Sequence, residues 1–139
     1  MNFNLQMQEE SLASLLRHAR ALKIWGVEIA ARLTSAAVGD NENADLEDTL
    51  DWWDEVVDAL ESIVQSTTTL VELEPGGGRR EIAFFQIKVS TTQVKSDIMD
   101  VDQQTIHYGI GDEIRIDLFD DLLEFEMELT RVGAFVIQE

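Results

Sequence analysis

The sequence predicts an α+β fold, in which an N-terminal antiparallel helical hairpin packs on one face of a five- to six-stranded, mainly antiparallel sheet. Residues 9–66 repeat apolar side chains every three or four positions, which is typical of amphipathic helices. Residues 67–139 contain short stretches in which apolar and polar residues alternate, which is typical of strands with one buried face. Helices followed by a meander of strands favour a two-layer sandwich.

The first helix is expected in residues 9–38. The segment before it, residues 1–8, alternates Phe3, Leu5 and Met7 with polar residues and predicts a short strand or a lead-in to the helix. The helix carries an apolar seam with several small residues, so another helix can approach it closely. The seam consists of Leu12, Leu15, Ala19, Leu22, Gly26, Ile29, Leu33 and Ala36. The polar break at 39–43, which begins with a glycine, predicts a turn into an antiparallel neighbour.

The second helix is expected in residues 44–65, and its two faces differ sharply. Its apolar face contains Trp53 and should pack against the small seam of the first helix. The face comprises Leu46, Leu50, Trp52, Trp53, Val56, Val57, Ala59, Leu60, Ile63 and Val64. Its other face is acidic and consists of Glu47, Asp48, Asp51, Asp54, Glu55, Asp58 and Glu61. No Lys or Arg occurs between Arg32 and Arg79, so no basic residue four positions away answers these carboxylates.

Strands are expected in the second half of the chain, at 67–74, 82–89, 105–110, 113–119 and 124–129, with 132–137 extending the last strand or forming another. The Pro-Gly-Gly-Gly segment at 75–78 predicts a turn. In 124–129 the apolar residues should face the core, and the acidic residues should form a row on the wet face. That row is Glu124, Glu126 and Glu128. With no repeat and no long linker, residues 1–139 are expected to form one domain.

Composition limits the classes of partner. The chain has 28 acidic and 10 basic residues and a formal net charge of −18. Such a charge disfavours nucleic acid and anionic membranes as direct partners and favours a basic protein surface. A surface rich in acids and poor in lysine also arises by adaptation to high salt. The chain has no cysteine, and its N-terminal segment has neither the basic nor the apolar region of a signal peptide. We therefore expect a cytoplasmic protein.

Four further groups of residues could carry chemistry, and each has a simpler interpretation. His18 has no orienting carboxylate nearby in the sequence, and His107 with Tyr108 lies in an expected strand, so structural roles are favoured. Asp97, Asp100, Asp102 and Gln104 partly follow calcium-loop spacing, but the loop's glycine and closing glutamate are missing. The loop 75–80 ends in Arg79-Arg80 and could meet an anion, although a flexible hairpin tip is the favoured interpretation. We expect no enzyme, metal or cofactor.

The acidic helix face suggests the function. Its seven acids lie over about fifteen residues, or one charge per about 3 Å at 1.5 Å rise per residue. One DNA strand carries a charge every 3.4 Å or so. We therefore expect a non-enzymatic, acidic inhibitor of the anti-defence or immunity type, which covers a basic nucleic-acid-binding surface of a partner protein as a nucleic-acid mimic. The alternative is a structural subunit of an oligomeric assembly, such as a virion or secretion component, whose acidity reflects salt adaptation. Both hypotheses are compatible with a homo-oligomer.

Overall fold

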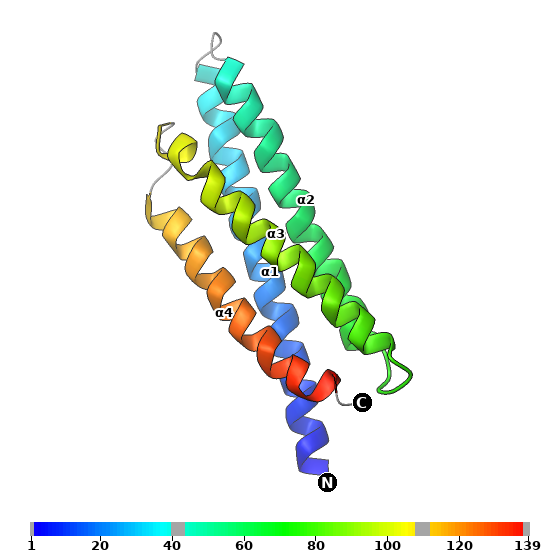
Figure 1. Ribbon diagram of the computed structural model, residues 1–139. Helices are drawn as coiled ribbons and strands as arrows, with labels where there is room; N and C mark the ends of the chain where they lie inside the picture. Colours follow the sequence, from blue (N-terminus) through cyan, green and yellow to red (C-terminus); the bar gives the residue numbers. More distant parts are fainter. Residues whose placement is uncertain (1, 40–43, 108–111, 138–139) are drawn as a thin grey trace.

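The chain forms an up-and-down bundle of four helices (Figure 1). The computed structural model describes residues 2–39, 44–107 and 112–137. The helices are α1 (Asn2–Gly39), α2 (Ala44–Glu72), α3 (Arg79–His107) and α4 (Asp112–Val136). α1 and α3 each pack against both α2 and α4. The helices therefore form a square in cross-section, with α1 and α3 on one diagonal and α2 and α4 on the other.

The core follows a helical period in all four elements. Each helix contributes a seam of buried side chains at spacings of mostly three and four residues, as a bundle requires. In α4 the seam is Leu118, Leu122, Phe125, Leu129, Val132 and Val136. In α3 it is Ala83, Phe84, Ile87, Thr91, Val94 and Ile98. The largest fully buried side chain is Trp53 of α2.

The predicted helical hairpin is present, although both helices are longer than expected. The segment 1–8 was expected to be a strand or lead-in, but its described part, from Asn2, is the start of α1. α1 projects beyond the other helices at this end (Figure 1). α2 continues through the threonine-rich segment that was expected to begin the sheet. Thr67, Thr68 and Thr69 each donate a side-chain hydrogen bond to the carbonyl four residues earlier, so their hydroxyl groups are satisfied within the helix.

The predicted sheet is wrong: residues 79–107 and 112–136 are helical, and no strand occurs in the described residues. Short apolar runs fit a buried helix as well as a strand, so periodicity over six to eight residues could not separate the two. Segment 124–129 shows the error. As a strand it would bury Phe125, Met127 and Leu129 together, but the helix buries Phe125 and Leu129 and leaves Met127 60% exposed. The burial pattern over 117–136, the part of α4 whose side chains are described, has the helical period.

The turn predicted at residues 75–78 is confirmed, but it joins α2 to α3 and not two strands. Gly76, Gly77 and Gly78 have φ values of 102°, 71° and 75°. These left-handed conformations are open to glycine at little cost, which explains the run of three glycines between two antiparallel helices. The polar break at 40–43 and the last part of the expected strand 105–110 lie outside the described residues.

Candidate functional site

A row of exposed carboxylates runs along the outer face of α2. Asp51, Asp54, Glu55 and Asp58 are all exposed and follow helical spacing, so they share one face. Within the described part of the chain none of the four makes an ion pair. We call these four residues the α2 acidic stripe. Glu47 and Asp48, which were predicted to extend it, lie in the first turns of α2, and their side chains are outside the described set.

The opposite face of α2 fixes this stripe in place. The indole N–H of Trp53 donates a buried hydrogen bond of 2.8 Å to the carbonyl oxygen of Gly26 in α1. A Cβ atom at Gly26 would lie 2.5 Å from Cδ1 of Leu60, so the two helices approach too closely here for any larger residue without a shift. The predicted packing of the Trp-bearing face against the small seam of α1 is therefore confirmed. The stripe is presented by a rigid element, because the side chains beneath it are locked in the core.

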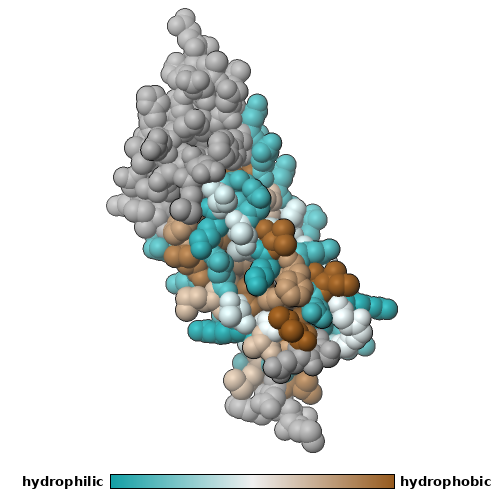
Figure 2. Space-filling model, in the orientation of Figure 1, coloured by the Kyte–Doolittle hydropathy of each residue, from teal (hydrophilic) through white to brown (hydrophobic). Residues whose placement is uncertain are grey.

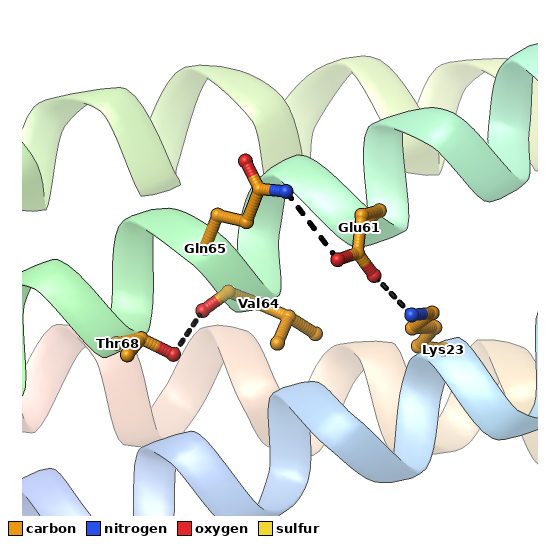
Figure 3. A network of polar contacts seen from close by, with 5 residues as sticks. All are labelled: Lys23, Glu61, Val64, Gln65 and Thr68. Atoms are coloured by element: carbon orange, nitrogen blue, oxygen red, sulfur yellow. Dashed lines mark hydrogen bonds and ion pairs between the residues drawn. The ribbon is translucent and has the colours of Figure 1, made fainter.

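Glu61, predicted as part of the acidic face, is instead engaged by α1. The ammonium group of Lys23 forms an ion pair with a carboxylate oxygen of Glu61, and the side-chain amide of Gln65 donates a hydrogen bond of 3.4 Å to the other oxygen (Figure 3). The hydrogen bond from Lys23 lowers the pKa of Glu61 below its ordinary value. Desolvation opposes this shift, whereas the charge of Lys23 and the hydrogen bond from Gln65 lower the pKa further. Glu61 therefore joins α1 to α2 and is not free for a partner.

The predicted row Glu124, Glu126 and Glu128 is dispersed around α4. Residues two apart on a helix point in directions about 200° apart, so they cannot form one line. Glu126 faces α3, where its carboxylate lies 3.2 Å from the ammonium nitrogen of Lys95. The side chain of Glu128 is only 14% exposed and lies 3.5 Å from a guanidinium nitrogen of Arg131. Only Glu124 is exposed.

A second acidic row does exist on α4, but its members differ from the prediction. Asp117, Asp120 and Glu124 are exposed and lie three and four residues apart, so they share one face. We call them the α4 acidic row. The strand assignment concealed it, because alternation pairs Glu124 with Glu126, whereas a helical period pairs it with Asp120. Applied to residues 112–136, the helical period would have found these residues in the sequence.

The acidic residues are distributed unequally among the helices. α2 contains nine acidic and no basic residues, and α4 contains eight acidic and two basic residues. α1 has three acidic and four basic residues, and α3 has four of each. The two acidic helices are therefore diagonal, and each has two nearly neutral neighbours. At neighbour spacings of 8–10 Å the diagonal is roughly 14 Å, longer than the Debye length of about 8 Å at physiological salt, so their mutual repulsion is screened.

The other candidate groups do not form a site. Arg80, suspected of contacting an anion, is only 4% exposed, whereas Arg79 is exposed. His18 is half-buried on α1. Asp97 lies in helix α3 and not in a calcium loop. The backbones of Asp100, Asp102, Gln104 and His107 are also in α3, but their side chains lie outside the described set. Tyr108 lies wholly outside it. Among described residues no group of three or more His, Asp or Glu side chains could hold a metal ion.

The described helices also contain no apolar stretch long enough to cross a membrane. Comparisons of the chain with protein-family models, with curated proteins and with solved structures gave no match. The candidate site is therefore defined by its geometry alone: a rigid helix face with four exposed, unneutralised carboxylates.

Proposed function

We propose that this chain is a non-enzymatic protein-binding module, an acidic inhibitor whose α2 acidic stripe covers the basic, nucleic-acid-binding surface of a partner protein. The observation that carries the proposal is the stripe itself. Glu61 and Glu126 are neutralised by lysines of neighbouring helices, whereas Asp51, Asp54 and Asp58 make no ion pair in the described chain. Their charge is therefore available to a cation outside the molecule.

The spacing of the stripe supports a nucleic-acid-like contact. Asp51 and Asp58 are seven residues apart, or about 10.5 Å along the helix axis at 1.5 Å per residue. The four carboxylates follow one another at about 4.5, 1.5 and 4.5 Å along the axis, and the mean of about 3.5 Å is close to the roughly 3.4 Å between phosphates along one DNA strand. A groove whose Lys and Arg side chains are spaced for one phosphate strand would meet a similar number of negative charges per unit length.

Binding to basic proteins encoded by neighbouring genes tests the proposal. Each purified candidate is immobilised, and the affinity of the chain is measured by biolayer interferometry at several salt concentrations. We expect the affinity of a true partner to fall steeply with salt, because the contacts are between exposed charges. A DNA duplex that binds the same partner should compete with the chain for it.

Two variants of equal charge locate the contact. Asp51→Lys/Asp54→Lys/Asp58→Lys reverses the α2 acidic stripe and should abolish binding. Asp117→Lys/Asp120→Lys/Glu124→Lys reverses the α4 acidic row, changes the net charge equally and should retain binding. Circular dichroism must show native helicity for both variants. Unchanged affinity of the α2 variant would refute the proposal and would favour salt adaptation as the origin of the acidity.

A further inference from the structure

An apolar ridge lies on the outer face of α3. Ile82, Phe85 and Val89 are 63%, 43% and 70% exposed, and their spacing of three and four residues places them on one side of the helix. Figure 2 shows hydrophobic side chains gathered on the face where α3 lies toward the viewer. The T-shaped contact between Phe84 and Phe85, with ring centroids 5.4 Å apart, connects this ridge to the buried core. Intramolecular packing therefore leaves these three large side chains uncovered.

A groove of about 460 Å³ runs beside the ridge, between α3 and α4. Phe84, Thr91, Leu129 and Ile137 are among the residues that line it, and Lys88 stands on its wall. Ile137 is itself 48% exposed. The face thus combines a ridge and an adjacent groove that run along the same pair of helices. A two-fold axis through the centre of the ridge would place the ridge of each copy against the ridge of the other, with the groove of each copy alongside the contact.

The charges beside the ridge also fit a second copy. Glu81 and Lys88 are seven residues apart, so they lie on the same flank of α3, and neither makes an ion pair within the described chain. The ridge is centred between Phe85 and Gln86. When two α3 helices cross antiparallel about that centre, Glu81 of each copy lies near Lys88 of the other.

The α3 part of this face carries few acidic residues. Along 79–96, the exposed charged side chains are those of Arg79 and Lys88, and Glu81 is half-buried. Two copies of a chain with a net charge of −18 repel one another least where their acidic residues are fewest. The α2 acidic stripe lies on a different helix, so contact through α3 leaves it accessible.

We propose that two copies of the chain associate through the α3–α4 face about a two-fold axis near Phe85, with their α3 helices antiparallel. Ile82 of each copy packs opposite Val89 of the other, and Glu81 forms an ion pair with Lys88 across the interface. The proposal does not rest on the proposed function, since it uses another surface of the molecule.

Sedimentation equilibrium from about 1 to about 500 µM tests the association, because a dimer's population depends on concentration. We expect the mass to rise from the monomer value of 15.7 kDa toward twice that value. Val89→Glu should weaken association at least tenfold or so, because it places a carboxylate on the apolar ridge. Ser62→Glu adds the same charge on the exposed side of α2 and should leave association unchanged.

Charge exchange tests the antiparallel register. Lys88→Glu and Glu81→Lys should each weaken association, and the double variant should restore it, because the ion pair is re-formed with its charges exchanged. The chain has no cysteine. The double variant Ile82→Cys/Val89→Cys should therefore form a disulfide-linked dimer on mild oxidation, whereas each single variant should not. Circular dichroism confirms folding in every case.

Three results would overturn the proposal: a mass of 15.7 kDa at every concentration, association unaffected by Val89→Glu, or no rescue in the charge-exchanged variant. A heterologous partner for this face would give the first result. A parallel or shifted contact between copies would give the third.

Discussion

The helix pairs α1–α2 and α3–α4 are built from the same kinds of contact but are closed to different degrees. In each pair a glycine faces a large side chain, Gly26 against Leu60 and Gly133 against Phe84. In the described residues each pair also contains an interhelical Lys–Glu ion pair, Lys23 with Glu61 and Lys95 with Glu126. Only the first pair adds a buried indole hydrogen bond, from Trp53.

The outer surfaces of the two pairs differ further. A groove also lies between α1 and α2, but Arg20 and Lys23 contribute to its lining, and Glu61 lies beside it. The groove between α3 and α4 is lined by apolar residues such as Phe84 and Leu129 and also by Lys88 and Glu126. Both pairs expose large apolar side chains, Ile24 and Val27 on α1 and Ile82 and Val89 on α3. The outer faces differ most between α2, which carries the α2 acidic stripe, and α3, which carries the apolar ridge. Similar internal packing in two helix pairs can thus support two different external surfaces.

Truncating the large core residue of each pair should give the largest effect. We expect Trp53→Ala to reduce the free energy of unfolding by about 4 kcal/mol and Phe84→Ala by about 3 kcal/mol. Trp53 is 2% exposed and loses a hydrogen bond as well, whereas Phe84 borders a groove that water and neighbouring side chains can enter. Urea unfolding followed by circular dichroism measures both values. A larger loss of unfolding free energy for Phe84→Ala would contradict the view that the contact between α1 and α2 is the more completely buried one.

Replacing each glycine with alanine should give a smaller difference in stability between the two helix pairs. A Cβ atom at Gly133 would lie 2.6 and 2.9 Å from two atoms of the Phe84 ring, which cannot bend away. We expect Gly133→Ala to cost about 1–2 kcal/mol, because overpacking exceeds the gain of roughly 1 kcal/mol in helix propensity. At Gly26 the closest atom is the end of the flexible Leu60 side chain, 2.5 Å away, so Gly26→Ala should stay within about 0.5 kcal/mol of the wild type.

Chemical denaturation of both alanine variants gives this comparison. Phe84→Leu provides the control, because a smaller and more flexible side chain should remove most of the penalty of Gly133→Ala in the double variant. Equal effects at the two glycines would show that ring rigidity does not decide the cost.

Breaking either interhelical ion pair should give the smallest loss of stability. The pH dependence of that loss distinguishes the two ion pairs. The folded-state pKa of Glu61 is lowered, so the unfolded chain binds the proton more tightly, and the stabilisation by Lys23 is fully present above the unfolded pKa of about 4.3. It is lost as the pH falls through the folded pKa. Lys23→Met should therefore lower Tm slightly at pH 7, and the difference from the wild type should shrink as the pH falls below about 4.

Calorimetry over that pH range measures the difference, with NMR titration of the Glu61 carboxyl as the direct readout. Lys95→Met is the matched variant in the second pair and should leave the Glu61 titration unchanged. A difference in Tm that grows on acidification would contradict the assigned sign.

The sequence located the helical hairpin because its pattern is long. Seams such as Leu12 to Ile29 repeat over several turns, and Gly76 to Gly78 mark a break that few other residues permit. The assignment from sequence failed after residue 66 because the apolar runs there are short and are interrupted by acidic residues. In addition, Thr and Ile have a high intrinsic preference for strands. Packing against α1 and α2 overrides that local preference, since only a helix buries Phe125 and Leu129 while leaving Met127 outside.

For the candidate site, the sequence alone determined that α2 has one apolar and one acidic face, and that the chain is strongly acidic. Which carboxylates remain available was decided only by the tertiary structure, because the lysines that neutralise Glu61 and Glu126 come from neighbouring helices, 38 and 31 positions away along the chain. The same is true of the apolar ridge on α3: whether Val89 faces the core or solvent depends on which side of the helix the other three helices cover. Helical period is a local property of the sequence, whereas charge pairing and exposure depend on contacts between distant segments.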